Sequence, residues 1–274
     1  MTDRREVMRV SGFSRVSPRG GTATMPLRNT ATLAWRTLVQ IKHNPFELID
    51  FSIQPIMFLL LFTYVFGGAM AGSPAEYLTF ALPGIIVQNL MFATMNTGIG
   101  LNTDITKGVF DRLRSLPISR FSPLAGRITA DVVKQAWAIA LLLVIGMILG
   151  FRIETGPAAA LAAVGLLLVF AVALAWTSVL VAMLVSSPEK VQIFGFVLYF
   201  PITMASGAFV DPATMPGWLQ AFAEVNPTTL LADAVRGLLS GGPVAGPVTW
   251  SLVWSAGLLL IFAPLSVRAF RRRV

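Results

Sequence analysis

The chain has 274 residues, of which 55% are hydrophobic and only 12% are charged, and its formal net charge is +8. It contains no cysteine, which excludes disulfides and thiolate metal sites. It also lacks a G-x-x-x-x-G-K-[ST] motif, so it does not bind ATP in the P-loop manner. Long apolar stretches without the alternation of barrel strands predict an all-α, polytopic membrane protein.

The first 44 residues divide into two parts. Residues 1–26 are rich in Arg, Ser, Gly and Thr and have no apolar core, which predicts a flexible cytoplasmic tail. Residues 27–44 have the pattern of a basic amphipathic helix, with Trp35 on its apolar face and Arg36 on its polar face. A helix of this kind lies in the membrane interface rather than across the bilayer.

Six uncharged stretches follow, each close to the roughly 20 residues that cross a hydrocarbon layer of about 30 Å as a helix. The third is the shortest, but Lys134 can reach the interface and let its helix begin earlier. The expected spans are residues 48–67, 78–101, 132–151, 158–185, 191–209 and 247–269. The sequence therefore predicts six transmembrane helices.

The basic residues predict the orientation. Nineteen of the 21 Lys and Arg residues lie before the first span, between the second and third, between the fourth and fifth, or after the last. Only Arg152 and Arg236 fall in the other connections. Because cytoplasmic loops are enriched in Lys and Arg, both termini are expected in the cytoplasm of a multi-pass cell-membrane protein. The positive charge is thus a topology signal and does not indicate nucleic-acid binding.

The second expected span is unusually polar. Asn89 and Asn96 are seven residues apart and share a helix face, which also carries Phe92. Amides within a bilayer must face protein or water, so they form either interhelical hydrogen bonds or a face that lines a transport path or a dimer seam. In the second interpretation this face meets the fifth span. The predicted substrate path consists of Asn89, Phe92, Asn96, Phe200, Met204 and Phe209.

Two segments outside the spans have a pattern of their own. Residues 104–120 combine basic and acidic residues with an apolar strip. Pro117 would end a helix in this segment, so the sequence predicts a short helix at about 105–116. It is either a docking element or a solvated helix. Residues 206–242 are too interrupted for a span and too apolar for a loop, so we expect a re-entrant or interfacial helical hairpin at about 212–240 before the last span.

Three phrases resemble a known family: DITKGVFDRLRSLPISRFSPLAGRITAD, SSPEKVQ, and FPITMASGAFVDPATMPGWLQAFAEVNPTTLLADAVRGLL. They are similar to the membrane (permease) subunit of type-2 ABC transporters, in the daunorubicin-resistance-type branch of exporters. The resemblance extends over about residues 27–270 and implies one type-2 ABC transmembrane domain at residues 27–274.

This resemblance implies a transport subunit that is not itself an enzyme. ATP and Mg would bind to a separate ABC ATPase subunit, present in two copies, and two copies of the permease would pair as a homodimer. The helix at about 105–116 would be the coupling helix that contacts the ATPase. The implied coupling residues are Thr106, Lys107, Gly108, Asp111, Arg112, Arg114, Ser115, Leu116 and Pro117.

The implied cargo is amphipathic or hydrophobic, as in drug or antibiotic efflux. A lipid or polysaccharide exporter of the same class is the alternative. A secondary transporter would show internal repeats and ionisable residues near the midplane, and neither is visible in the sequence. A membrane enzyme would need a cluster of His, Asp, Glu or Cys at one interface, which the sequence also lacks.

Overall fold

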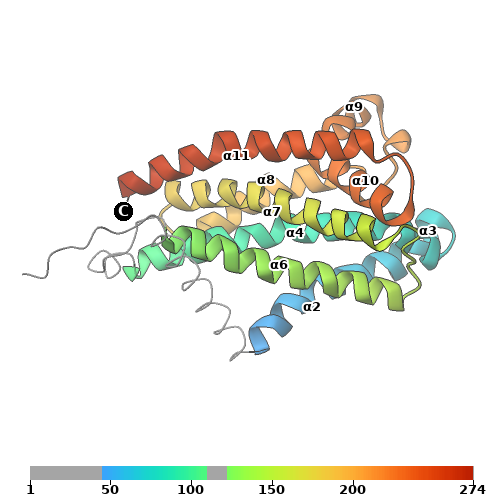
Figure 1. The fold of residues 1–274 in the computed structure, drawn as a ribbon, viewed down its shortest axis with the longest axis horizontal. Coiled ribbons are helices and arrows are strands. Elements are labelled where there is room, and N and C mark those ends of the chain that lie inside the picture. The colour runs from blue at the N-terminus through green and yellow to red at the C-terminus, as the bar shows by residue number, and fades with distance from the viewer. Residues whose placement is uncertain (1–44, 110–121, 274) are drawn as a thin grey trace, which may run out of the picture.

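A computed structural model describes residues 45–109 and 122–273, and every regular element within these two ranges is helical (Figure 1). The all-α class is therefore confirmed for the described part of the chain. The expected tail at 1–26 and amphipathic helix at 27–44 lie outside it. The elements are α2 (Pro45–Leu61), a π-helix (Phe62–Phe66), α3 (Gly67–Ala71), α4 (Pro74–Thr106), α6 (Ser122–Ile148), α7 (Pro157–Leu184), α8 (Pro188–Met204), a 3₁₀ turn (Pro212–Thr214), α9 (Gly217–Val225), α10 (Pro227–Ser240) and α11 (Ala245–Arg273).

Five helical stretches in the described ranges are long and apolar enough to cross a membrane. They are Ser52–Met70, Pro74–Thr106, Gly126–Ile148, Pro157–Leu184 and Ala245–Arg273. The expected span that is missing from these five is the fifth, which corresponds to α8, a helix of 17 residues. At 1.5 Å per residue it is about 25 Å long, slightly less than a typical hydrocarbon layer.

The helices lie side by side with α4 at their centre. α4 packs against α6, α7, α8 and α10, while α11 packs against α7 and α10 (Figure 1). α3, α9 and α10 gather at one end of the bundle, and the carboxyl end of α11 lies at the other (Figure 1). α4 has almost no amphipathic character because neighbouring helices cover most of its surface.

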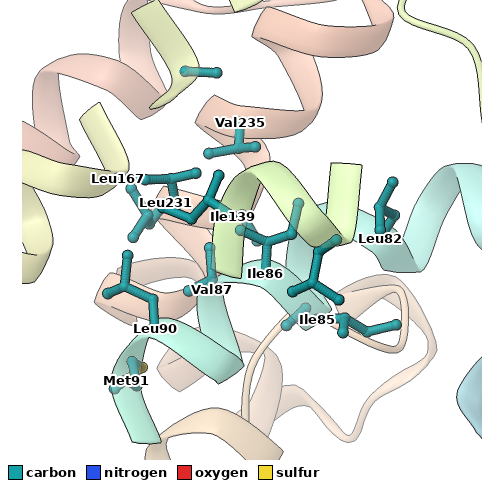
Figure 2. Packing of buried hydrophobic residues seen from close by; sticks show 14 of the residues in the cluster. Leu82, Ile85, Ile86, Val87, Leu90, Met91, Ile139, Leu167, Leu231 and Val235 are labelled. Carbon is teal, nitrogen blue, oxygen red and sulfur yellow. The ribbon is translucent and has the colours of Figure 1, made fainter. Parts of the chain in front are cut away.

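The core is built around the first half of α4. Ile86 and Leu90 of α4 are fully buried and lie among Ile139 of α6, Leu167 of α7 and Leu231 of α10 (Figure 2). Within a bilayer, lipid tails are as apolar as these side chains, so close van der Waals packing rather than water exclusion holds the helices together. This packing places α4 between the helices on either side of it.

Two helix ends differ from the sequence-based expectation. α4 continues to Thr106, beyond the expected end of the second span at 101, and the chain turns at Lys107 and Gly108. Gly108 has φ +66°, a conformation that favours glycine. A coupling helix therefore does not begin at residue 105, and residues 110–121 lie outside the described ranges.

The second difference concerns α8, which ends at Met204 rather than at 209. The Ser206 hydroxyl donates to the carbonyl of Thr203 (2.6 Å) and accepts from the N–H of Ala208 (3.3 Å). A serine that bonds its neighbouring backbone in this way competes with helix hydrogen bonds and favours the end of the helix. The chain after Met204 consequently leaves the direction of α8.

The segment expected to form a hairpin contains two short helices, α9 and α10, that meet at Asn226. The Asn226 side chain caps α10 by accepting from the N–H of Thr228 at 2.9 Å. Its Nδ2 donates to the carbonyls of Ile202 (2.8 Å) and Ala205 (3.1 Å) at the end of α8. One buried amide thus sets the angle between α9 and α10 and attaches both to α8.

Gly84 lets the backbone of α4 approach the backbone of Ala208, in the chain that follows α8. A Cβ atom at Gly84 would overlap the carbonyl oxygen of Ala208 and lie 2.7 Å from its carbonyl carbon. We expect Gly84→Ala to destabilise the protein by about 1–3 kcal/mol, because backbone rather than a flexible side chain must move. Thermal unfolding of the purified protein, followed by tryptophan fluorescence, measures this effect.

Gly165→Ala is the matched control, because Gly165 lies within α7 and a Cβ there meets nothing within 4 Å. Alanine favours a helix over glycine by roughly 0.5–1 kcal/mol, so this variant should unfold at an equal or higher temperature. Equal Tm values for the two variants would contradict the close approach at Gly84.

Candidate functional site

A cavity of about 1050 Å³ lies between α2, α4, α6 and α8. Its wall combines three kinds of side chain: aromatic and methionine side chains, carboxamides, and charged groups. The aromatic and methionine members are Phe58, Phe92, Met95, Phe196, Phe200 and Met204; the carboxamides are Gln54, Gln88, Asn89, Asn96, Gln135 and Gln192; the charged members are Arg127, Asp131 and Lys134. A large apolar pocket with a few convergent polar groups is the usual form of a small-molecule site.

The aromatic wall is formed mainly by α8 and α4. The rings of Phe196 and Phe200, one turn apart on α8, stack with centroids 4.9 Å apart and planes at 17°. Phe92 of α4 lies 6.0 Å from Phe196, centroid to centroid. α8 buries one stripe against the bundle and leaves these rings uncovered by protein. Aromatic faces and flexible methionines adapt to apolar ligands of varied shape.

The amides of α4 separate into two groups. Asn102 is fully buried and its Nδ2 donates to the carbonyls of Ala182 (2.8 Å) and Val185 (3.0 Å), so it joins α4 to the end of α7. Asn89 and Asn96 instead line the cavity, and no hydrogen bond joins either side chain to another helix within the described ranges. Asn102 thus forms interhelical hydrogen bonds, whereas Asn89 and Asn96 face the cavity.

Charged residues of α6 occupy one end of the cavity. Nη1 of Arg127 donates to Oδ2 of Asp104 at 2.8 Å, and its Nε lies 3.9 Å from Oδ2 of Asp131. Gly100 makes this position possible, because a Cβ there would overlap the Arg127 guanidinium. Lys134, about two turns further along α6, also lines the cavity. The ion pair joins the last turns of α4 to the first turns of α6.

Sequence reasoning missed these charged residues as part of the site. They were assigned to a cytoplasmic connection because the third span was expected to begin at residue 132, whereas α6 begins at Ser122. The spacing of Arg127, Asp131 and Gln135, four residues apart, was a signal that they share one helix face.

The structure brings together five of the six residues of the predicted path: Asn89, Phe92, Asn96, Phe200 and Met204 all line the cavity. Phe209 does not. Its ring packs on Phe62 of the π-helix, with centroids 4.7 Å apart, and its carbonyl accepts a hydrogen bond from the Tyr77 hydroxyl at 3.1 Å. Because α8 ends at Met204, Phe209 no longer follows the helical face that carries Phe200.

The predicted coupling residues are only partly described. Thr106 ends α4, and Lys107 and Gly108 form the turn that follows it. The remaining predicted coupling residues, from Asp111 to Pro117, lie outside the described ranges. Within those ranges no three His, Cys, Asp or Glu side chains come together as a metal site would require.

Comparison with known proteins shows the family. The sequence profile described as ABC-2 type transporter matches residues 28–239. The chain is 42% identical over 244 residues to the daunorubicin resistance ABC transporter permease protein DrrB1 of Streptomyces coeruleorubidus, covering 89% of this chain and 86% of that protein. It is 28% identical over 239 residues to the probable doxorubicin resistance ABC transporter permease protein DrrC of Mycobacterium tuberculosis, covering 86% of each. The chain therefore belongs to the ABC-2 type transporter family and is a multi-pass membrane permease.

Proposed function

We propose that this permease exports amphipathic compounds with flat aromatic rings, as in drug or antibiotic efflux, through the cavity between α2, α4, α6 and α8. The observation that carries the proposal is the wall of this cavity, where aromatic rings lie beside amides without interhelical hydrogen bonds in the described ranges. Sites for drug-sized ligands measure about 300–1,000 Å³, so the cavity of about 1050 Å³ is large enough for one. The names of the relatives, which refer to daunorubicin and doxorubicin resistance, agree with such cargo.

The proposed topology has six spans, with α8 as the fifth and the α9–α10 hairpin on the outer side. Both termini are cytoplasmic. This is supported by the three arginines at the end of α11, which lie at the same end of the bundle as the end of α4 and the start of α6 (Figure 1). A 17-residue helix can span with slight local thinning of the bilayer.

Family membership implies an ATPase subunit as the partner, since the permease is the transport part of an ABC transporter. In the proposed assembly two permease copies pair, and two ATPase subunits bind ATP and Mg. The segment between Thr106 and Ser122 contacts the ATPase through residues 106–117. The two helices that enter and leave this segment, α4 and α6, both line the cavity, which gives ATPase movements a direct route to it.

Phe196→Ala tests the proposed site. Removing this ring should raise the KM for ATP-dependent uptake of daunorubicin about threefold to tenfold, because an aromatic contact contributes about 0.5–1.5 kcal/mol beyond its buried area. Uptake is measured in inside-out proteoliposomes that contain the permease and its ATPase.

Phe194→Ala is the matched control, since Phe194 lies on the same helix, is 55% exposed and does not line the cavity. The KM of this variant should equal that of the wild type. Equal KM values for both variants would place the path elsewhere. A wild-type complex that moves a lipid or polysaccharide but not daunorubicin would favour the alternative exporter class.

A further inference from the structure

Three polar residues of α6 form a strip along the cavity: Arg127, Asp131 and Gln135, which we call the α6 polar strip. Their spacing of four residues places them on successive turns of one helix face. The charged side chains that line the cavity therefore all come from α6, whereas its aromatic rings come mainly from α8 and α4.

Gln135 is the centre of the argument. The residue is only 3% exposed, it lines the cavity, and its Oε1 has no hydrogen-bond partner within the described ranges. Buried polar groups in proteins are nearly always hydrogen-bonded, and ligand pockets contain a few polar groups that orient the ligand. An unpartnered amide oxygen in the cavity wall is therefore a candidate for such a group. The amide offers both acceptor and donor capacity to a molecule in the cavity.

Arg127 contributes a second group of this kind. Its Nη1 is held by Asp104, whereas its buried Nε makes no hydrogen bond within the described ranges and lies 3.9 Å from Asp131. The absence of a side chain at Gly100 leaves the space that the guanidinium occupies, and the ion pair with Asp104 holds it there. The strip is therefore a preorganised set of donors and acceptors.

Arg127, Asp131 and Lys134 line the cavity, and Asp104 pairs with Arg127, so these four described residues comprise two cations and two carboxylates. A ligand is then selected by hydrogen bonds rather than by net charge. We infer that the α6 polar strip binds a hydroxyl- and amine-bearing head group of an amphiphilic cargo whose ring system lies against Phe92 and Phe196. This inference rests on the proposed function, because it assumes that cargo occupies the cavity.

The experiment compares daunorubicin, which carries an amino sugar, with its aglycone, which lacks that head group. Binding to the full permease–ATPase complex in nanodiscs is measured by the fluorescence of the compound. The wild type is expected to bind the glycoside more tightly than the aglycone. Gln135→Leu should reduce this preference about threefold to tenfold, as expected for the loss of one or two hydrogen bonds.

Thermal stability distinguishes a ligand-binding role from a structural one. Replacing a buried amide that has no partner by a leucine of similar size is neutral or stabilising, so the Tm of Gln135→Leu should equal or exceed that of the wild type. Gln135→Met, which keeps the unbranched shape, repeats the measurement if the leucine variant fails to fold. Gln220→Leu on α9, outside the cavity, should leave the preference unchanged.

The outcomes separate the two proposals. Unchanged preference in the Gln135 variants overturns the head-group site. Equal wild-type affinity for the glycoside and the aglycone also overturns it, while the proposed export of aromatic amphiphiles stands. A wild-type complex that neither binds nor transports either compound contradicts both.

Discussion

Arg236→Met should destabilise the folded protein by about 2 kcal/mol, because it removes a partly exposed ion pair together with hydrogen bonds to two carbonyls and a cation–π contact. Arg236 on α10 is paired with Asp233, and its guanidinium also donates to the carbonyls of Phe80 (3.2 Å) and Gly207 (3.4 Å). The same group lies 4.1 Å from the centroid of the Phe80 ring. One side chain thus holds α10 against α4 and the chain after α8. Thermal unfolding in nanodiscs measures the loss.

The loss should depend on pH in a defined direction. Burial raises the pKa of the Asp233 carboxyl above its ordinary value, although Arg236 lowers it. Without Arg236 the lowering influence disappears, so this pKa rises further. A carboxyl with a raised pKa in the folded state stabilises that state when protonated, and the stabilisation is lost as pH rises through the folded-state pKa. The difference in Tm between wild type and Arg236→Met should therefore be smaller in mildly acidic buffer than at neutral pH.

Two variants control this experiment. Arg152→Met changes an exposed arginine that has no ion pair within the described ranges, and its effect should stay within about 0.5 kcal/mol. Asp233→Asn combined with Arg236→Met removes both charges and should recover part of the loss. A double variant less stable than the single one, or a loss that does not change with pH, would contradict the assigned pairing.

The sequence predicted the cavity face of α4 because helical periodicity holds along a regular helix. Asn89, Phe92 and Asn96 are spaced so that any α-helix brings them to one side, and no tertiary information is needed for that step. The same periodicity brings Phe200 and Met204 of α8 to the cavity. It failed for Phe209, because the Ser206 side chain favours the end of the helix and the periodicity stops there.

A polar residue forms hydrogen bonds between helices or lines the cavity according to its neighbours from other helices, which are distant in the sequence. Asn102 resembles Asn96 in sequence, yet only Asn102 lies beside the free carbonyls at the end of α7. Arg127 joined the site because α6 begins ten residues before the expected span. A span limit set by charged residues places the start of a helix too late when the first turns of that helix are polar. Such positions follow from packing between helices, which local patterns do not determine.

Asp104→Arg is expected to lower ATP-dependent transport of daunorubicin more than tenfold while ATP hydrolysis continues. The pair of Asp104 and Arg127 joins α4 to α6 at the segment proposed to contact the ATPase. With two cations facing each other, the helices separate there, and movement of the segment is no longer passed to both walls of the cavity. The side chains of the pair are 38% and 28% exposed, so its loss costs only about 1 kcal/mol and the protein remains folded. Transport and hydrolysis are measured on the same proteoliposomes, and the exchange Asp104→Arg with Arg127→Asp should restore much of the transport.

Gly100→Ala should also displace the Arg127 guanidinium from Asp104, without changing any charge. The added methyl group overlaps the end of the flexible Arg127 side chain rather than backbone, so the guanidinium must move while the helices remain packed. This variant should therefore also hydrolyse ATP with reduced transport, whereas Gly257→Ala on α11, where a Cβ meets nothing within 4 Å, should behave as the wild type.

If transport and hydrolysis fall in equal proportion in Asp104→Arg and Gly100→Ala, the pair of Asp104 and Arg127 supports assembly with the ATPase instead of coupling. If neither variant changes transport, the contact between α4 and α6 has no part in the transport cycle. Since one variant alters charge and the other only position, agreement between them would assign the effect to the location of the guanidinium.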